Sequence, residues 1–309
     1  MSKGINKDNQ INLGINIKNI NMKGKTVVIT GFTSGIGLAT AKVLAGSGAY
    51  VIGTGRSEDR CLQAEKIIKS EYPESKVSYL IADLSSLKQV RELACKIKKL
   101  AGEKGNGIID VLINNAGTFS SWYVSTPEGF ELQFAVNHLA PFLLTNELLP
   151  LLQKAPAGRI ITVSSGSHYR TKIHWNDIML RKRYNCLLAY KQSKLANVLF
   201  TIELNRRLGQ NSTVRAYAVD PGLVNTDIGF KGTTGIARWI WKRRSKAGVP
   251  PERPAQSIAF IAGEPSIQKS SEVYWKDCKP MKPSRYSQKP EAALRLWEIS
   301  AKMCGIQSL

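Results

Sequence analysis

The stretch TVVITGFTSGIG at residues 26–37 decides the fold of this chain. Its first five residues are apolar or β-branched and predict a short buried strand. Gly31, Gly35 and Gly37 then form a turn, and an apolar pattern with helical spacing begins at Leu38. Glycines let the backbone approach a pyrophosphate closely, and a helix N-terminus offers free N–H groups and the positive end of a dipole. A G-x-x-x-G-x-G turn between a strand and a helix therefore predicts a dinucleotide-binding α/β domain.

Apolar runs along the chain predict further strands of the same sheet. They cover residues 50–55, 77–81, 108–113, 159–165, 214–219 and 272–275. The run at 108–113 is continuously apolar, which indicates a central strand covered on both faces. Asn-Asn-Ala-Gly at 114–117 follows it and is expected to line the cofactor cleft. We expect one doubly wound parallel sheet of about seven strands, with helices on both faces.

The length of 309 residues and the hydrophobic content of 43% are sufficient for one large α/β domain. Residues 1–22 are rich in Asn, Ile and Lys with little periodicity, so we interpret them as a flexible N-terminal arm and place the domain at 23–309. The five cysteines lie far apart without a Cys-x-x-Cys pair, which favours reduced thiols and no metal site. No run approaches the ~20 apolar residues of a membrane span, so we expect a cytoplasmic protein.

Basic residues outnumber acidic residues by 44 to 23, which gives a net charge of +21. Such a charge attracts phosphate cofactors, anionic membrane surfaces and nucleic acids. The lysines are spread along the chain and no nucleic-acid recognition motif is present, so we do not expect nucleic acid as a partner.

Side chains at two strand ends indicate the kind of dinucleotide. An acidic residue at the end of the second strand would bind the ribose 2′-hydroxyl of NAD, whereas an arginine accommodates the 2′-phosphate of NADP. The chain has Arg56 there and no acidic residue before Glu58, which predicts NADP(H); the alternative is a solvated surface arginine. Asp83 at the end of the third strand is placed to meet the adenine amino group or to cap the helix that starts near Ser85 or Ser86.

Tyr190 and Lys194 lie four residues apart in an apolar-periodic helix, so their side chains share one face. An adjacent ammonium favours the phenolate and lowers the tyrosine pKa from its usual value near 10. Such a pair also occurs for structural reasons alone, so its interpretation as a catalytic pair depends on motifs elsewhere in the chain. Ser165 ends a buried strand, where open parallel sheets place ligands, and it is placed to donate a hydrogen bond to a substrate carbonyl. Residues 166–185 are expected to form a long loop.

A long helix is predicted over residues 128–153, with a kink at Pro141. Asn137 near this kink is a polar candidate, and its alternative role is to satisfy backbone groups that the kink frees. His138 beside it is interpreted as a structural histidine, because the sequence gives it no catalytic partner.

A turn and a lid are expected after the sixth strand. Pro221 and Gly222 turn the chain out of the sheet, where it is placed to cover a nicotinamide. Residues 223–253 combine Trp239 and other aromatic residues with a basic cluster, which favours a mobile substrate lid. The alternative is an interfacial helix that makes peripheral contact with a membrane.

Together, these motifs resemble the short-chain dehydrogenase/reductase family over roughly residues 23–309. The matching positions, in the family's order, are Thr30-Gly31-x-x-x-Gly35-Ile36-Gly37, Asp83, Asn114-Asn115-Ala116-Gly117, Asn137, Ser165, Tyr190-x-x-x-Lys194 and Pro221-Gly222. Segments 136–145, 193–200 and 296–298 are similar to the retinol dehydrogenase-like branch, which includes the WW-domain oxidoreductase. Phe32 and Thr33 depart from the small or amide residues usual in that branch. The resemblance implies a single Rossmann-type fold.

The resemblance also implies a role for each catalytic residue. Tyr190 would be the general acid for carbonyl reduction and the base for alcohol oxidation, and Ser165 would polarise the carbonyl. Lys194 would lower the Tyr190 pKa and hold the nicotinamide ribose, while Asn137 would position a water that relays protons to Lys194. The implied cofactor-binding residues are Gly31, Thr33, Ser34, Gly35, Ile36, Gly37, Arg56, Asp83, Leu84, Asn115, Ala116, Gly117, Tyr190, Lys194, Pro221, Gly222, Val224 and Thr226.

The function implied by the resemblance is an NADP(H)-dependent oxidoreductase acting on CH–OH donors. It would interconvert a lipophilic carbonyl compound, with a retinoid among the candidates, and the corresponding alcohol by hydride transfer. The alternative is a non-catalytic NADP-binding scaffold or regulatory protein, which would bind cofactor without turnover. The family often forms homo-oligomers through the helices that carry Asn137 and Tyr190.

Overall fold

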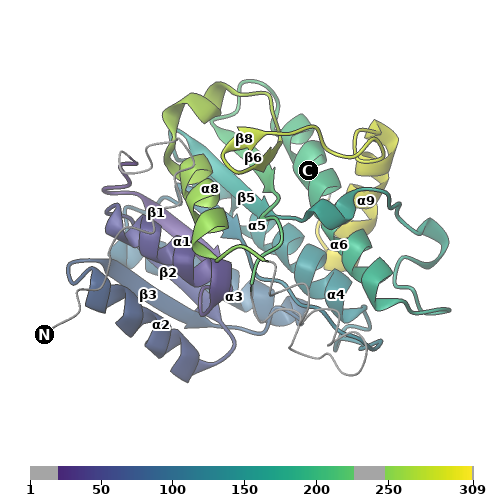
Figure 1. Cartoon of the computed structure of the whole chain (residues 1–309), viewed down its shortest axis with the longest axis horizontal. Coiled ribbons are helices and arrows are strands. Elements are labelled where there is room, and N and C mark those ends of the chain that lie inside the picture. Colours follow the sequence, from purple (N-terminus) through teal and green to yellow (C-terminus); the bar gives the residue numbers. More distant parts are fainter. Residues whose placement is uncertain (1–19, 226–247, 308–309) are drawn as a thin grey trace, which may run out of the picture.

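The computed structural model describes residues 20–225 and 248–307, which form one sheet covered by helices (Figure 1). The eight strands stand in the order β3-β2-β1-β4-β5-β6-β7-β8. Their bounds are β1 Thr26–Thr30, β2 Tyr50–Gly55, β3 Lys76–Ile81, β4 Val111–Asn114, β5 Gly158–Val163, β6 Val214–Val219, β7 Tyr274–Lys276 and β8 Lys279–Pro280. Strands β1 to β7 pair in parallel, and β8 pairs antiparallel with β7. The predicted parallel sheet is confirmed, and the short β8 comes in addition to the expected strands.

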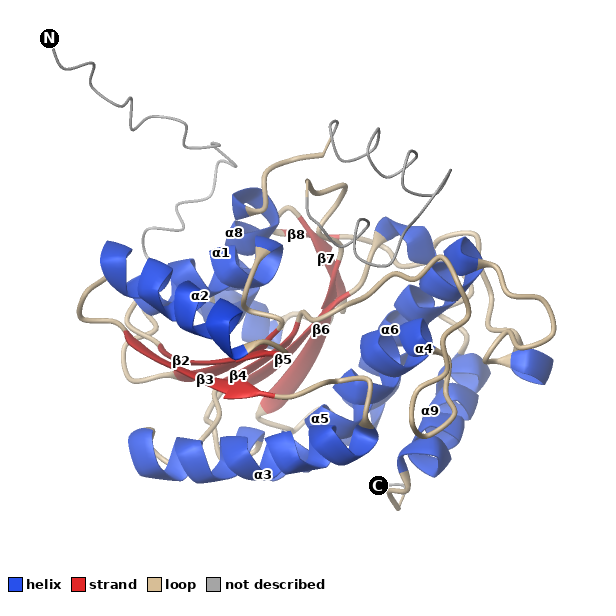
Figure 2. Ribbon diagram, turned by 90° about the horizontal axis from the view of Figure 1, so that it is seen from below, coloured by secondary structure: helices blue, strands red, loops and turns tan. Residues whose placement is uncertain are grey.

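Two layers of helices cover the sheet. Their bounds are α1 Gly35–Gly46, α2 Glu58–Glu71, α3 Leu87–Lys104, α4 Leu132–Phe134, α5 Ala140–Leu152, α6 Cys186–Leu208, α8 Glu252–Gly263 and α9 Pro290–Cys304. Figure 2 shows α1, α2 and α8 on one face of the sheet and α3, α5, α6 and α9 on the other. Each layer encloses its own apolar cluster against the strands.

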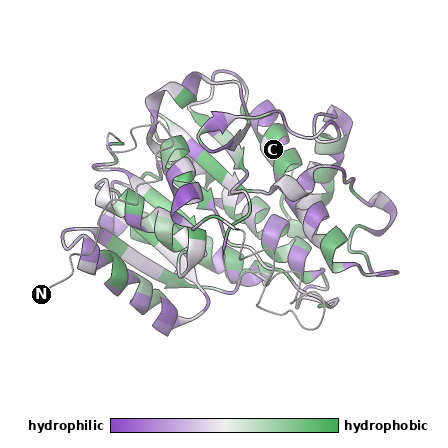
Figure 3. Cartoon of the chain, viewed as in Figure 1, coloured by the Kyte–Doolittle hydropathy of each residue, from purple (hydrophilic) through white to green (hydrophobic). Residues whose placement is uncertain are grey.

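Strand β1 shows how the sequence builds both clusters. Val27 and Ile29 belong to the cluster under α1 and α8, whereas Val28 belongs to the cluster on the opposite face. All three side chains are fully buried. Alternate residues of a strand point to opposite faces, so a strand covered on both sides must be continuously apolar. Burial of each such side chain contributes ~1.5–3 kcal/mol, and Figure 3 shows the central strands as predominantly apolar.

The strand order fixes the place of a ligand site. Strands β2 and β3 lie on one side of β1, whereas β4 and all later strands lie on its other side. The connections after β1 and β4 therefore diverge at their carboxyl ends. In open α/β sheets, ligands bind in the crevice at this point of reversal.

The helix predicted over residues 128–153 is irregular in its interior. Helical residues run from Leu132 to Leu152, and a π-helical turn over Ala135–Leu139 joins α4 to α5. This turn ends two residues before Pro141, whose ring nitrogen cannot donate a backbone hydrogen bond. The irregularity expected at Pro141 is thus located in the preceding turn, and Asn137 is the central residue of that turn.

Two segments near the predicted boundaries pack against the domain. Met22, which we expected in the flexible arm, is buried, and its N–H donates to the Ser47 carbonyl at 2.9 Å. Helix α8 begins at Glu252, within the predicted lid, and packs on α1. Residues 1–19 of the arm and 226–247 of the lid lie outside the described residues. In the part of the chain that is described, no helix has both the length and the apolar character needed to cross a membrane.

Helix α9 packs across α5 and α6. The Trp297 ring is buried, with its centroid 4.9 Å from that of Phe142 and 5.9 Å from that of Phe200. His138, predicted to be structural, is fully buried, and its Nε2 lies 2.8 Å from the Ser300 hydroxyl on α9. The helices for which we expect subunit contacts are thus partly covered within the chain, and a homo-oligomer stays a prediction.

Candidate active site

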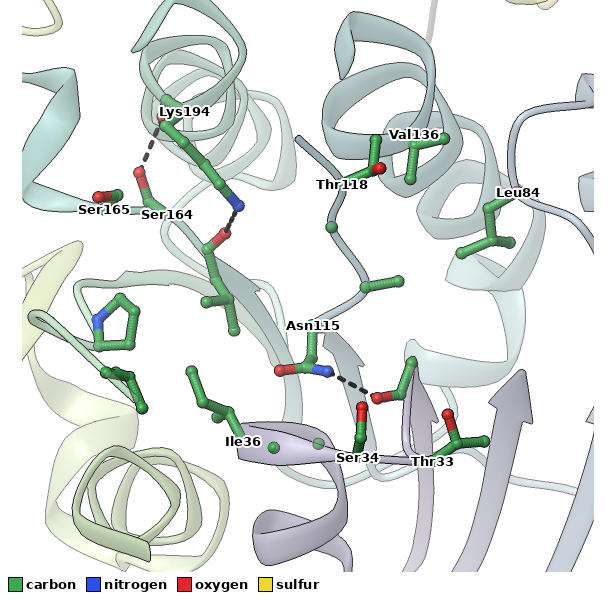
Figure 4. A pocket seen from close by; sticks show the side chains of 18 of the residues that line it. Thr33, Ser34, Ile36, Leu84, Asn115, Thr118, Val136, Ser164, Ser165 and Lys194 are labelled. Carbon is green, nitrogen blue, oxygen red and sulfur yellow. Dashed lines mark hydrogen bonds between the residues drawn. The ribbon is translucent and has the colours of Figure 1, made fainter. Parts of the chain in front are cut away.

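A cavity of about 600 Å³ opens at the carboxyl ends of the parallel strands. It contains almost all the residues that the sequence predicted for cofactor binding, from the glycine turn after β1 to the turn after β6. These lining residues are Gly31, Thr33, Ser34, Gly35, Ile36, Gly37, Arg56, Asp83, Leu84, Asn115, Ala116, Gly117, Tyr190, Lys194, Pro221, Gly222 and Val224. Thr226, also predicted, lies outside the described residues. Figure 4 shows Ser34 and Ile36 across the cavity from Ser165 and Lys194.

The glycine turn leaves no room for side chains. A Cβ atom on Gly37 would stand 2.2 Å from the Gly31 carbonyl oxygen, and a Cβ on Gly31 would stand 2.9 Å from the Ala116 Cα. Gly31 also has a φ of 69°, which disfavours other residues. Helix α1 starts after Ser34 without a side-chain cap, and its first residues, Gly35 to Gly37, line the cavity. A close backbone and an uncapped helix N-terminus fit the diphosphate of a dinucleotide.

Thr30 and Asn115 hold the two diverging strand ends together. The Thr30 hydroxyl accepts hydrogen bonds from the N–H groups of Asn115 and Ala116, both at 3.0 Å. The Asn115 amide donates in return to the carbonyls of Thr30 at 2.9 Å and Gly31 at 3.2 Å. Asn115 thus supports the strand end and lines the cavity, and its contact with a cofactor stays a prediction.

The wall at the end of β2 is basic. Arg56 and Arg60 are both exposed and both line the cavity. The sequence analysis named Arg56 alone. Arg60 lies in the first turn of α2, after the N-cap Ser57, whereas Arg56 precedes this helix. The two guanidinium groups offer paired donors of the kind that bind a phosphate.

Asp83 and Ser86 divide the two roles that the sequence left open. Ser86 is the N-cap of α3, since its hydroxyl accepts from the Gln89 N–H at 3.4 Å. Asp83 lines the cavity, and its Oδ1 accepts from the Ser85 N–H at 2.9 Å. The helix cap is therefore Ser86, and Asp83 remains the candidate for contact with an adenine.

Tyr190, Ser165 and Lys194 meet at the inner wall of the cavity. Burial raises the pKa of the Tyr190 phenol to about 12, with a smaller raising effect from the Asp220 carboxylate, and a hydrogen bond from Ser165 opposes this shift. We expected Lys194 to lower the pKa of Tyr190. This prediction is wrong, because burial dominates and raises that pKa. The Lys194 Nζ lies 5.7 Å from the Tyr190 ring centroid and donates to the Val163 carbonyl at 3.0 Å.

Lys194 is itself deeply buried. Burial lowers the pKa of its ammonium to about 8. Its backbone is anchored to β5, because the Ser164 hydroxyl donates to the Lys194 carbonyl at 2.8 Å. The site thus holds a protonated phenol beside an ammonium that loses its proton more readily than a solvated lysine.

Asn137 is not part of the cavity wall. Its Oδ1 accepts from the Thr118 N–H at 2.7 Å, and its Nδ2 donates to the Thr118 carbonyl at 3.1 Å and to the Ser193 hydroxyl at 3.0 Å. These bonds join the segment after β4 to α6, which carries Tyr190 and Lys194. The water relay expected through Asn137 stays a prediction.

Besides Arg60, two further charged residues on the described part of the cavity wall were not among the predicted site residues. Asp220 is buried, and its Oδ1 accepts from the Gly222 N–H at 2.9 Å. Lys276 enters from the end of β7. Asp220 was visible in the sequence only as the start of a turn, and Lys276 carried no motif, because its place depends on the pairing of β6 with β7.

A comparison with family models identifies the protein class. A model described as short chain dehydrogenase matches residues 25–234, which include the glycine turn, Ser165, Tyr190 and Lys194. The chain belongs to the short-chain dehydrogenase family. It is therefore a dehydrogenase or reductase by family, as the resemblance implied.

This short-chain dehydrogenase is similar over most of its length to retinol dehydrogenases. Retinol dehydrogenase 13 of Homo sapiens is 39% identical over 296 residues, covering 92% of this chain and 86% of the relative. Retinol dehydrogenase 12 of Mus musculus is 38% identical over 294 residues, covering 95% of this chain and 90% of the relative. The predicted retinol dehydrogenase-like branch is confirmed by these similarities.

Solved structures share the fold. An uncharacterized protein from Mycobacterium Paratuberculosis superimposes with a TM-score of 0.73 at 31% identity, covering 95% of this chain and 98% of that chain. The angucycline C-6 ketoreductase LanV, solved with bound NADP, gives a TM-score of 0.66 at 25% identity and covers 83% of this chain and 95% of its own.

Proposed function

We propose that this short-chain dehydrogenase interconverts a lipophilic aldehyde or ketone and its alcohol with NADP(H) as cofactor. The observation that carries the proposal is the hydrogen bond between Ser165 and the Tyr190 phenol on the cavity wall, next to buried Lys194. A hydroxyl donor and a phenol at one point bind a carbonyl oxygen from two sides. This geometry suits the transfer of a proton to that oxygen.

The residues of this chain divide the work of carbonyl reduction as follows. Ser165 donates a hydrogen bond to the carbonyl oxygen and polarises it. Tyr190 holds its proton at neutral pH, because burial raises its pKa to about 12, and it gives this proton to the oxygen as charge develops there. The ammonium of Lys194 stabilises the phenolate that remains. When bound, the nicotinamide cofactor supplies the hydride.

The preference for NADP(H) over NAD(H) rests on Arg56 and Arg60. Both guanidinium groups line the cavity where β2 ends and α2 begins, at the place where the adenosine ribose binds in such folds. A 2′-phosphate would pair with these cations, whereas a free 2′-hydroxyl would leave them without an anionic partner. LanV, whose structure holds NADP, supports the same preference by similarity.

We infer a lipophilic substrate from the apolar part of the cavity wall. Leu132, Val136 and Leu223 line the cavity and offer apolar contacts. Relatives named retinol dehydrogenases make a retinoid aldehyde the first compound to test.

The proposal is tested by following NADPH and NADH oxidation by the purified protein with aliphatic, aromatic and retinoid aldehydes. We expect turnover with NADPH, a lower kcat/KM with NADH, and higher kcat/KM for longer apolar aldehydes. Tight NADPH binding without turnover across the whole panel would favour the non-catalytic scaffold instead. Equal kcat/KM for the two cofactors would contradict the role of the arginines.

A further inference from the structure

His168 lies three residues after Ser165 and is fully buried outside the cavity wall. It ends a 3-10 turn over Gly166–His168, which connects β5 to the long loop before α6. A buried polar ring requires partners for both nitrogens. The partners of His168 link the serine of the site to the C-terminal part of the chain.

Both ring nitrogens of His168 are used. Nδ1 lies 2.9 Å from the carbonyl oxygen of Ser165, and Nε2 accepts a hydrogen bond from the Ser284 N–H at 3.1 Å. A backbone N–H only donates, so Nε2 must carry the lone pair and Nδ1 the hydrogen. The ring is therefore neutral, and it donates to Ser165. Burial lowers the pKa of this histidine, in agreement with the neutral form.

The ring cannot turn freely, because two tyrosines enclose it. Its centroid lies 4.1 Å from that of Tyr169 and 4.8 Å from that of Tyr274 on β7. The Tyr169 hydroxyl donates to the Lys282 carbonyl at 2.6 Å. Residues 282–284 are thus bound both by the tyrosine and by Nε2 of the histidine.

His168 fixes the peptide that carries the Ser165 side chain. The Ser165 carbonyl accepts two hydrogen bonds from His168, one from its backbone N–H at 3.1 Å and one from Nδ1. On the side-chain end, the Ser165 hydroxyl accepts from the Ser167 N–H at 3.1 Å and is bonded to Tyr190. The direction of the Ser165 hydroxyl therefore depends on a peptide that His168 holds.

We propose that His168 is a positioning residue for Ser165: its neutral ring ties the Ser165 carbonyl to the backbone of Ser284 and so keeps the serine hydroxyl directed at Tyr190 and at the substrate carbonyl. The inference rests on the proposed function, because Ser165 must act on a substrate for its position to affect the rate. The competing explanation is that His168 only fills the space between two tyrosines.

Two isosteric variants separate these explanations. In His168→Asn the amide nitrogen replaces Nδ1 and still donates to Ser165, but the Ser284 N–H loses its acceptor. In His168→Gln the amide oxygen replaces Nε2 and still accepts from Ser284, but the Ser165 carbonyl loses its side-chain donor. Each variant removes the ring from Tyr169 and Tyr274, so both should show a similar fall in Tm.

The expected result is a kcat that distinguishes the two variants. His168→Gln should lose ~10- to 100-fold in kcat, the effect of a misplaced catalytic group, with the KM for NADPH unchanged. His168→Asn should keep most of its kcat at the same Tm. Equal kcat values in the two variants, or kcat losses that follow Tm, would overturn the proposal.

Amide hydrogen exchange gives a second readout that needs no turnover. The Gln variant should lose protection at residues 165–168, and the Asn variant at residues 284–287. If the wild-type protein turned over no carbonyl compound, the proposed function would fail, and exchange would still decide whether His168 holds Ser165. Equal loss of protection at both segments in both variants would overturn the positioning role by itself.

Discussion

The Nζ of Lys194 donates a 3.0 Å hydrogen bond to the carbonyl oxygen of Val163, the last residue of β5. The ammonium is thereby held inside the domain, at the strand end that leads to Ser165. Burial of a cation is unfavourable, and here it lowers the lysine pKa to about 8. Buried Lys194 therefore lowers the stability of the fold, but it supplies the positive charge that the proposed chemistry needs.

Replacement of Lys194 by methionine should stabilise the protein at neutral pH while abolishing turnover. A fall in pKa from 10.5 to about 8 corresponds to roughly 3 kcal/mol, and loss of the bond to Val163 offsets about 1 kcal/mol of this gain. The folded state releases the lysine proton near pH 8 and the unfolded state near 10.5, so wild-type stability rises between these values.

Urea unfolding at pH 7 and at pH 10.5 checks this prediction. The advantage of Lys194→Met over wild type should be greatest below pH 8 and should decrease at the higher pH. Exposed Lys191 on the same helix provides the control, and Lys191→Met should leave the free energy of unfolding nearly unchanged at both values. A Lys194→Met protein less stable than wild type at pH 7 would show that burial of the ammonium does not lower the free energy of unfolding.

Replacement of Gly37 by alanine should abolish cofactor binding. The added Cβ would stand 2.2 Å from the Gly31 carbonyl oxygen, so the turn after β1 must move. Gly102→Ala on α3 is the matched control, because a Cβ there meets no atom within 4 Å, and removing a helical glycine should stabilise by ~0.5–1 kcal/mol. Titration of both variants with NADPH decides the point, and unchanged affinity in Gly37→Ala would contradict it.

Replacement of Arg56 or Arg60 by glutamine should weaken NADPH binding selectively. A hydrogen bond to a charged group contributes about 1.5–3 kcal/mol, so each change should raise the Kd for NADPH by roughly 10- to 100-fold and leave the Kd for NADH nearly unchanged. Arg183, which is exposed and does not line the cavity, provides the control. An equal loss of affinity for NADPH and NADH would contradict the proposal that the two arginines bind the 2′-phosphate.

Truncation of Trp297 to alanine should cost ~3–5 kcal/mol of the free energy of unfolding. The indole packs between α5 and α6, and the Arg207 guanidinium stands 4.5 Å above its ring. Leu294→Ala on the same helix is the control, because Leu294 is 38% exposed and should cost far less. Similar losses in the two variants would mean that α9 contributes little to the core.

Local pattern was sufficient to predict the sheet and much of the cavity wall. The strand, glycine turn and helix at residues 26–46 are encoded by neighbouring residues, and strand ends in a parallel sheet necessarily converge. For this reason Arg56, Asp83, Asn115 and Ser165 could be placed at one edge of the sheet from the sequence alone. Arg60 was missed because it lies in α2 whereas Arg56 precedes that helix, so no helical spacing links the two side chains.

Contacts between distant segments could not be predicted in this way. Ser284 lies 116 residues from His168, and Asn137 bonds to Thr118 and Ser193 through a π-helical turn that no local pattern indicated. The direction of the Tyr190 pKa was wrong for the same reason. Sequence spacing indicated a nearby charge, whereas the depth of burial, which dominates, depends on the packed fold.

The central claim is that Tyr190 transfers a proton during NADPH-dependent carbonyl reduction. The most direct measurement compares NADPH oxidation with a lipophilic aldehyde by wild type, Tyr190→Phe and Tyr50→Phe, together with the Kd for NADPH of each. Tyr50 is a buried tyrosine at the start of β2; its hydroxyl donates to the Ser78 hydroxyl at 3.1 Å, and it does not line the cavity. We predict that Tyr190→Phe binds NADPH like wild type and loses ~10²- to 10⁴-fold in kcat, whereas Tyr50→Phe retains turnover. A Tyr190→Phe protein with wild-type kcat would contradict the account.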